Sequence, residues 1–261
     1  MIFTEVIKVP VVGGEQDRRS YVYVPDFAEE DHEARFPVLY MFDGQNVFFD
    51  SDATYGKSWG MLDYLEATGI PVIVAAVECN DGPNNERLSE YSPFDFYEAG
   101  FGSVTGRGKE TMEWYAGVFK PWVDSEFPTI PDRTHTMIAG SSMGGLMSLY
   151  ALMEYNHIYS KAAALSPSIS FSPGSVRHMI KDAVIDPDTT LYMDCGEREF
   201  GRHRHSDTIM GHFADVTTLL LKKRVRLTSR VVPDGTHTEA SWERQISIFM
   251  DTILYPIEDE L

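Results

Sequence analysis

The sequence predicts an α/β protein built on a mostly parallel sheet with helices on both of its faces. Short apolar runs rich in Val, Ile, Leu and Tyr alternate with longer segments of helical period, which is typical of strands buried on two sides. No linker rich in Pro, Gly or Ser divides the chain, and we find no internal repeat. A single domain over residues 1–261 therefore accommodates the whole pattern.

Eight apolar runs are predicted to form the strands of this sheet. The first two have no helical segment between them, which indicates an antiparallel hairpin, whereas the later ones alternate with helices. The predicted strands are Ile2 to Val9, Ser20 to Val24, Pro37 to Phe42, Pro71 to Glu78, Thr134 to Ala139, Lys161 to Leu165, Thr190 to Asp194 and Val225 to Val232.

Helices are predicted where apolar residues recur at intervals of three and four. Two other stretches, residues 43–60 and 79–109, are too long for plain connections, so we expect both to cover a functional site. The predicted helices are Thr111 to Glu126, Gly144 to Tyr155, Val176 to Val184, Asp207 to Lys223 and Thr238 to Leu254.

The charge balance is strongly acidic, with 22 Lys and Arg against 40 Asp and Glu and a net charge of −18. This balance repels polyanions, so it argues against nucleic acid as a ligand; it serves solubility or the attraction of cationic substrates. Cys79 and Cys195 lie outside any C-x-x-C spacing, and we expect core thiols, with neither a disulfide framework nor a zinc site.

Nothing in the sequence predicts contact with a membrane. The longest clear apolar run, Pro71 to Val77, falls well short of the roughly 18 to 20 residues of a membrane-spanning helix. Glu5 and Lys8 interrupt the apolar stretch that a signal peptide would need. We therefore expect a cytoplasmic protein.

The strongest local motif is G-x-S-x-G at residues 140–144, which follows a predicted strand and precedes a predicted helix. In this context the motif describes a sharp turn that presents a nucleophilic serine, here Ser142. The alternative is a plain glycine-rich start of a helix. A serine hydroxyl needs a base and a group that orients this base, so a histidine and a carboxylate should follow in the chain.

His237 has the best context for the base, because it lies after a predicted strand and before the last predicted helix. The alternative is an ordinary turn histidine. Asp194, Glu197 and Glu199 compete for the orienting acid at the end of another strand. Glu199 is favoured because it has the better reach from the loop; otherwise it would be a surface carboxylate.

Four sequence blocks resemble an esterase family of the α/β-hydrolase superfamily that includes feruloyl esterases, siderophore esterases and S-formylglutathione hydrolases. The resemblance spans most of the chain and implies an α/β-hydrolase fold. In the family's acid loop the carboxylate falls three residues after a glycine, which supports Glu199, although many relatives carry Asp there and Asp194 stays open. The blocks are Val38 to Asn46, Gly140 to Gly145, Asp194 to Glu199, and Gly235 to His237 with Trp242.

The resemblance also implies an oxyanion hole formed by backbone N–H groups. One donor would be Met143, directly after the nucleophile, and the other would be Gly44 or Gln45 in the loop after the early strand. Fixed donors are required there because negative charge develops on the carbonyl oxygen of the tetrahedral intermediate. Gly44 could instead be a plain turn residue.

The segment from Arg87 to Pro93 resembles one that runs along the substrate cleft in this family, so Arg87, Glu90 and Tyr91 are candidates for substrate contact. Alternatively, Arg87 and Glu90 pair with each other and hold the loop. Phe94 and Phe96 belong to the same long insertion, which we expect to act as a mobile cover that buries an acyl or aryl group.

The sequence thus predicts a serine carboxylic-ester hydrolase that acts on a small or aryl ester through an acyl-enzyme, with no cofactor and no metal. A siderophore trilactone esterase or an acyltransferase on the same scaffold is the alternative among enzymes. An inactive binding protein on a hydrolase fold is the alternative from another class. The expected partner is a small-molecule ester, and a homo-oligomer stays open.

Overall fold

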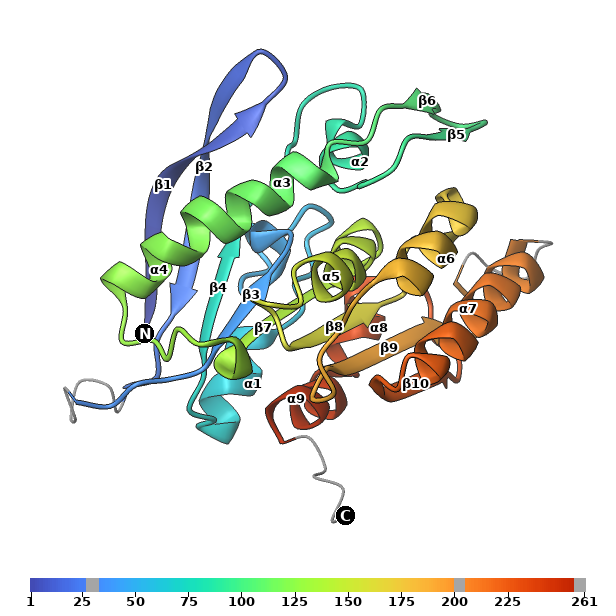
Figure 1. Cartoon of the computed structure of the whole chain (residues 1–261). Coiled ribbons are helices and arrows are strands. Elements are labelled where there is room, and N and C mark those ends of the chain that lie inside the picture. The colour runs from blue at the N-terminus through green and yellow to red at the C-terminus, as the bar shows by residue number, and fades with distance from the viewer. Residues whose placement is uncertain (27–32, 200–204, 256–261) are drawn as a thin grey trace, which may run out of the picture.

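An eight-stranded sheet runs through the computed structural model, which describes residues 1–26, 33–199 and 205–255 (Figure 1). Its spatial order is β1-β2-β4-β3-β7-β8-β9-β10, and it contains all eight predicted strands. These strands are β1 (Ile2–Val11), β2 (Gly14–Tyr23), β3 (Val38–Met41), β4 (Ile73–Val77), β7 (Thr136–Ser141), β8 (Lys161–Leu165), β9 (Thr190–Gly196) and β10 (Arg226–Val232).

The pairing directions confirm a mostly parallel sheet with an antiparallel hairpin at its beginning. β1 pairs with β2 in antiparallel register, and β2 pairs with β4 in the same sense. Every later pair of neighbours is parallel. The carboxyl ends of β3, β7, β8, β9 and β10 therefore meet at one edge of the sheet, where α/β folds place their ligands.

Helices cover both faces of the sheet, as the sequence predicts (Figure 1). Successive strand residues alternate between the two cores: Val38 and Tyr40 pack on the side of α3 to α7, whereas Leu39 and Met41 pack on the side of α1, α8 and α9. The helices are α1 (Met61–Thr68), α2 (Glu86–Glu90), α3 (Gly108–Trp114), α4 (Lys120–Glu126), α5 (Met143–Glu154), α6 (Pro173–Asp182), α7 (His205–Lys222), α8 (Glu239–Glu243) and α9 (Ile246–Leu254).

Three features of the helices differ from the prediction. The helix predicted from Thr238 to Leu254 is broken between α8 and α9, and a π-helical turn over Tyr115–Phe119 separates α3 from α4. The sequence reading missed α1, because its eight residues bury only Met61 and Leu65 in the core and so give little periodic signal.

The long segment at residues 79–109 contains structure that was not predicted. It includes α2 and a two-stranded hairpin of β5 (Phe96–Glu98) and β6 (Gly102–Val104). The hairpin packs against the short 3₁₀ turn Ile169–Phe171, where the ring of Phe96 stacks on that of Phe171 at 4.8 Å. Much of this segment is therefore fixed to the domain.

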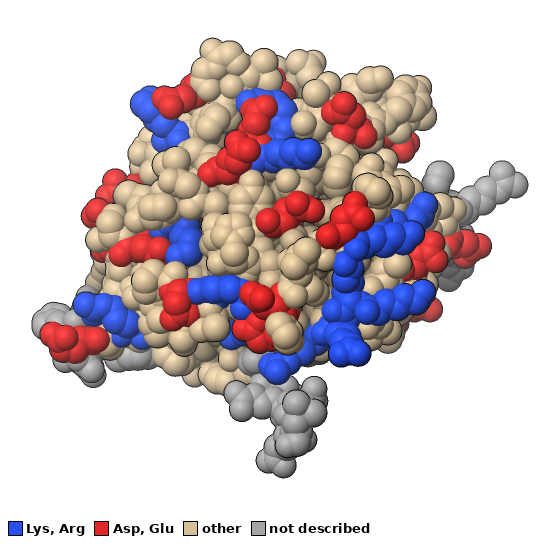
Figure 2. All heavy atoms as spheres, viewed as in Figure 1, with Lys and Arg blue, Asp and Glu red and all other residues tan. Residues whose placement is uncertain are grey.

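The surface in view mixes acidic and basic side chains, and Lys and Arg gather toward the lower right (Figure 2).

None of the helices in the described ranges is long and apolar enough to span a bilayer.

A buried ion pair ties the segment at residues 79–109 to the sheet. The two terminal guanidinium nitrogens of Arg18, Nη1 and Nη2, each donate to one carboxylate oxygen of Glu90 at 2.7 Å. The side chains of Arg18 and Glu90 are 2% and 7% exposed. A bidentate arginine–carboxylate pair satisfies both charges where water cannot.

Glu90→Ala should lower the free energy of unfolding by roughly 3–5 kcal/mol, because it leaves the Arg18 guanidinium buried without its counter-charge. Urea denaturation monitored by circular dichroism measures this change. The double variant Arg18→Met with Glu90→Leu removes both charges and should recover much of the loss. A single variant as stable as the wild type would contradict the prediction.

Candidate active site

Ser142 lies in the sharp turn between β7 and α5, at the carboxyl edge of the sheet. Its backbone has φ 57° and ψ −119°, a conformation that side-chain-bearing residues rarely adopt. The Ser142 N–H donates to the carbonyl oxygen of Leu165 on the neighbouring strand, and the Ser142 Oγ lies 3.3 Å from the Oγ of Ser168. This turn raises the hydroxyl above the sheet, as the motif predicts.

Small residues around Ser142 are needed because the strand and the helix approach closely. A Cβ atom on Gly140 would lie 2.7 Å from the backbone of Gly144, and one on Gly145 would lie 2.8 Å from the Leu165 carbonyl oxygen. These positions have no room for a larger residue unless the backbone shifts. The glycines therefore allow the close packing of β7 and α5 that produces the turn.

Glu199 and His237, which are 38 residues apart in the chain, meet at the same edge. The His237 Nδ1 lies 2.5 Å from the Glu199 Oε2. The pairing of β9 with β10 brings their two loops together, and the N–H of Arg198 donates to the carbonyl oxygen of Gly235 at 2.8 Å. The structure thus joins the histidine to the carboxylate that the sequence favours.

Ser166 and Trp242 hold the second oxygen of the Glu199 carboxylate. The Ser166 hydroxyl donates to Glu199 Oε1 at 2.6 Å and accepts from the Trp242 Nε1–H at 3.0 Å. Burial by itself raises the pKa of Glu199, but hydrogen bonds and charge from His237, Ser166 and the Gly196 N–H outweigh burial and lower this pKa. Glu199 therefore carries its negative charge at neutral pH.

Asp194 lies behind this arrangement and does not contact His237 among the contacts recorded in the described ranges. It is 1% exposed, accepts from the Ser166 N–H at 3.0 Å and accepts from the Tyr192 hydroxyl at 2.9 Å. Burial raises its pKa to about 7, and the charge of Glu199 adds to the rise. Its contacts support Ser166, which itself has a positive φ of 44°. Glu197 instead accepts from the Asp234 N–H at 3.0 Å on the surface.

The backbone N–H groups predicted to form the oxyanion hole, those of Met143, Gly44 and Gln45, have no acceptor among the hydrogen bonds of the described residues. Gly44 starts a short 3₁₀ turn, and a Cβ there would lie 2.7 Å from the backbone of Val77. The side-chain amide of Gln45 accepts a hydrogen bond at its Oε1 from the Cys79 N–H, at 3.2 Å. Gly44 is therefore required for close approach to β4.

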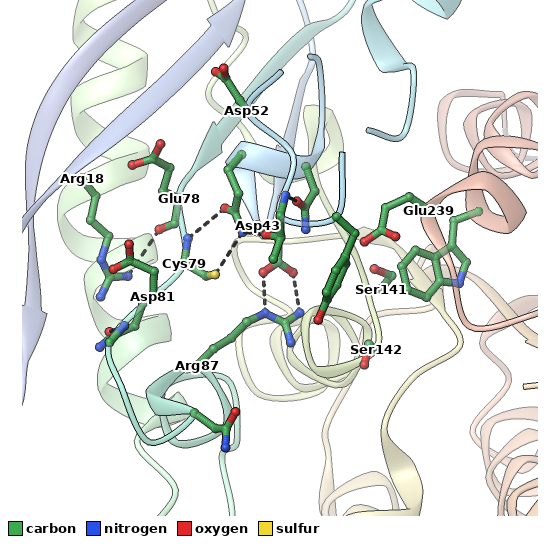
Figure 3. A pocket seen from close by; sticks show the side chains of 18 of the residues that line it. Arg18, Asp43, Asp52, Glu78, Cys79, Asp81, Arg87, Ser141, Ser142 and Glu239 are labelled. Carbon is green, nitrogen blue, oxygen red and sulfur yellow. Dashed lines mark hydrogen bonds and ion pairs between the residues drawn. The ribbon is translucent and has the colours of Figure 1, made fainter. Parts of the chain in front are cut away.

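A pocket of about 810 Å³ opens over this edge (Figure 3), and both Ser142 and His237 belong to its lining. Both long loops contribute to its lining. The lining residues are Gln16, Asp17, Arg18, Asp43, Gln45, Asn46, Asp52, Thr54, Tyr55, Glu78, Cys79, Asn80, Asp81, Gly82, Asn85, Arg87, Ser141, Ser142, His237, Thr238, Glu239 and Trp242.

Arg87 lines the pocket, but it does not pair with Glu90 as the structural alternative suggested. Its Nε and Nη2 donate to the two carboxylate oxygens of Asp43 at 2.5 and 2.6 Å (Figure 3). The Arg87 guanidinium also lies over the ring of Tyr91. Glu90 pairs with Arg18 instead. Arg87 and Glu90 thus each form an ion pair with a residue distant in sequence and not with each other.

The structure does not place the other candidates for substrate contact in this pocket. Glu90 and Tyr91 are buried beneath it, and the Tyr91 hydroxyl accepts from the Asp43 N–H at 3.3 Å. Phe94 packs against Tyr150 in a separate surface hollow, and Phe96 stacks on Phe171. The expected aromatic cover over Ser142 is thus corrected: these rings fasten the segment to α5 and to the loop after β8.

Sequence reasoning missed Ser166, Asp43 and Glu239. Ser166 directly follows β8, so its place at the carboxyl end of a parallel strand was an available signal. Asp43 was quoted only as part of a block, and its partner Arg87 is 44 residues away. No feature of the sequence near Glu239 distinguishes it from other carboxylates of helix starts.

Asp194→Asn should make stability less dependent on pH. Because its pKa is about 7 in the folded protein and 3.8 for an ordinary aspartate, the folded state keeps a proton that the unfolded chain releases. Asp194 therefore lowers stability as pH rises from about 4 to about 7, by on the order of 4 kcal/mol. Asparagine cannot ionise, so the free energy of unfolding measured by urea denaturation should decline less between about pH 4 and 7 in the variant than in the wild type.

Asp63→Asn is a matched control for that series, because Asp63 is an exposed aspartate on α1. Its free energy of unfolding should decline with pH as that of the wild type does. If the wild type and Asp194→Asn showed parallel declines, the raised pKa of Asp194 would be contradicted.

Comparisons with known proteins agree with the fold described above. One curated protein, "Uncharacterized protein YbbA" of Bacillus subtilis (strain 168), is 23% identical over 193 residues, 73% of this chain and 72% of that protein. A solved structure titled "ferulic acid esterase" matches with a TM-score of 0.68, 19% identity, and coverage of 97% of both chains. The structure titled "Siderophore hydrolase EstA from Aspergillus nidulans" matches with a TM-score of 0.70, 19% identity, and coverage of 95% and 93%.

The strand order, the turn at Ser142 and the carboxyl-edge pocket together describe an α/β-hydrolase fold. The sequence matches a family described as "Putative esterase" over residues 14–249, which is nearly the whole chain. The chain therefore belongs to this esterase family, and it is a hydrolase with an esterase fold.

Proposed function

We propose that this esterase hydrolyses a small or aryl carboxylic ester through an acyl-enzyme on Ser142, with His237 as the base and Glu199 as the orienting acid. The observation that carries the proposal is the contact of 2.5 Å between His237 Nδ1 and Glu199 Oε2 beside a serine held at positive φ. The proposal includes the small-molecule substrate and the cytoplasmic location expected from the sequence.

In this mechanism the His237 Nδ1 carries a proton because it faces a carboxylate, which leaves Nε2 to accept the proton of the Ser142 hydroxyl. The Ser142 Oγ attacks the ester carbonyl carbon, and His237 then gives the proton to the leaving alcohol. In the second half of the reaction, His237 takes a proton from the water that attacks the acyl-enzyme. The bond between the acyl carbon and Ser142 Oγ then breaks, His237 gives this proton to Ser142 Oγ, and the carboxylic acid leaves.

Two charges need stabilisation during these steps. The lowered pKa of Glu199 keeps this carboxylate ionised, so that it stabilises the imidazolium of His237 when the proton has moved. The Met143 N–H and one of the N–H groups of Gly44 and Gln45 would stabilise the oxyanion. Such donors act strongly because they are fixed before the reaction begins.

A siderophore esterase and an acyltransferase would use the same acyl-enzyme, with a trilactone substrate or an acceptor other than water. A panel of esters with varied acyl length, aryl acyl groups and thioesters, read as kcat/KM, separates these substrate classes. An inactive binding protein would hydrolyse none of them.

Ser142→Ala should reduce kcat for ester hydrolysis by about 10⁶, because it removes the nucleophile. Hydrolysis of a 4-nitrophenyl ester measures the rate, and circular dichroism confirms the fold. Ser141→Ala should cost much less, since the Ser141 side chain is mostly buried beside the turn. Full activity of a folded Ser142→Ala variant would overturn the mechanism.

Covalent labelling tests the same residue without a substrate. A fluorophosphonate should modify the wild type at Ser142 with loss of fluoride, as located by peptide mass spectrometry, and should not modify Ser142→Ala. Absence of labelling in the wild type would favour the inactive binding protein.

Glu199→Gln should lower kcat by about 10⁴, because a neutral amide neither stabilises the imidazolium nor enforces the Nδ1–H tautomer. Asp194→Asn and Glu197→Gln are the matched controls, since each also replaces one carboxylate with its amide. Both should retain far more activity than Glu199→Gln. If Asp194→Asn were the most damaging of the three, the acid assignment would be wrong.

A further inference from the structure

The lining of the pocket over Ser142 has more acidic than basic side chains. Its lining includes two arginines and no lysine. Against these stand six carboxylates: Asp17, Asp43, Asp52, Glu78, Asp81 and Glu239. The acids labelled in Figure 3 reach the cavity from the segments after β3 and β4 and from α8.

Both arginines are already neutralised by bidentate pairs. Arg87 donates to both oxygens of Asp43, and Arg18 donates to both oxygens of Glu90 beneath the pocket. Neither guanidinium thus offers an uncompensated positive charge to an anionic substrate. Asp17 pairs with the exposed Lys8, whereas Asp52 and Glu78 share the single cation of Arg19, so the side of the pocket at Asp52 and Glu78 has a net negative charge.

Glu239 is the most informative of these acids. It is 8% exposed, and Figure 3 shows its side chain pointing into the pocket beside Ser141. Within the described ranges, the only hydrogen bond recorded for its carboxylate comes from its own backbone N–H, and it forms no ion pair. Burial, and then the charge of Asp43, raise the pKa of Glu239; its own backbone N–H and the charges of His237 and Arg87 offset this rise only in part, so the negative charge is incompletely compensated.

An aromatic side chain in the same pocket suits a positively charged group. Tyr55 lines the pocket and is 82% exposed, so its ring is open to a ligand. Aromatic faces and carboxylates together are the groups that bind organic ammonium ions in proteins.

We propose that the pocket selects esters that carry an organic cation, a quaternary ammonium or a protonated amine, and that Glu239 binds this cation. The inference rests on the proposed ester hydrolysis and names its substrate class. Glu239, His237 and Ser142 line the same pocket, so a cation at Glu239 and the ester group at Ser142 would belong to one bound substrate. An anionic ester would meet the same carboxylates and be disfavoured.

Pairs of esters of equal shape test the proposal. Choline butyrate is compared with 3,3-dimethylbutyl butyrate, which replaces the nitrogen with carbon and so removes only the charge. A second pair places the cation in the acyl part: ethyl 4-(trimethylammonio)butanoate against ethyl 5,5-dimethylhexanoate. In at least one pair the cationic ester should have a kcat/KM about tenfold higher at low salt. This ratio should fall as salt rises from about 0.01 M to about 1 M.

Glu239→Gln should reduce the cationic-to-neutral ratio severalfold. The ratio is the correct readout because any effect of Glu239 on His237 changes both esters alike. Glu66→Gln is the matched control, since it removes the same charge from the exposed face of α1, outside the pocket lining. It should leave the ratio unchanged.

Binding to Ser142→Ala separates this inference from the proposed function. Isothermal titration calorimetry should show that choline binds this variant more tightly than 3,3-dimethylbutanol does, and that adding Glu239→Gln removes the difference. Ratios near one in both ester pairs, or a ratio that Glu239→Gln leaves unchanged, would overturn the inference while hydrolysis of the neutral esters upheld the proposed function. If no ester were hydrolysed, the calorimetry alone would decide whether the pocket binds cations.

Discussion

The hydrogen bond from the Ser166 hydroxyl to Glu199 is the contact on which the arrangement of the pocket edge depends. Ser166 follows β8, Glu199 follows β9, and the Trp242 Nε1–H that donates to Ser166 comes from α8. One hydroxyl thus connects three segments that are distant in sequence. With this oxygen of Glu199 held, the other faces His237 after β10, so the position of the imidazole follows from the register of the parallel strands.

Charge compensation organises the other half of the pocket. The pairs Arg18–Glu90 and Arg87–Asp43 connect the segment after β4 to β2 and to the turn after β3. Buried arginine–carboxylate pairs contribute little net stability compared with apolar packing, but breaking one is costly, so they fix geometry. The other carboxylates of the pocket have weaker compensation, because Asp17 pairs with the exposed Lys8 and because Asp52 and Glu78 share Arg19. The lining therefore carries a net negative charge.

The fold was largely predictable because its strands are buried on both faces. Runs such as Val38 to Met41 must be apolar at every position, which separates them clearly from amphipathic helices. The pairing of Glu199 with His237 also agrees with the favoured interpretation, since the ends of neighbouring parallel strands have to meet. Pairs such as Arg87 and Asp43 were not predictable, because a local partner at Glu90 looked equally suitable until three-dimensional packing was known. Phe94 and Phe96 were misplaced for a related reason: composition reveals that a loop is aromatic, but not which surface it faces.

The backbone conformation of Ser142 affects the thermal stability of the protein as well as its chemistry. A non-glycine residue at φ 57° costs on the order of 1–3 kcal/mol, which the surrounding strands and helix must offset. Glycine would adopt the same angles with little strain, so the melting temperature of a Ser142→Gly protein should exceed that of the natural chain. At position 142, selection for activity therefore opposes selection for thermal stability.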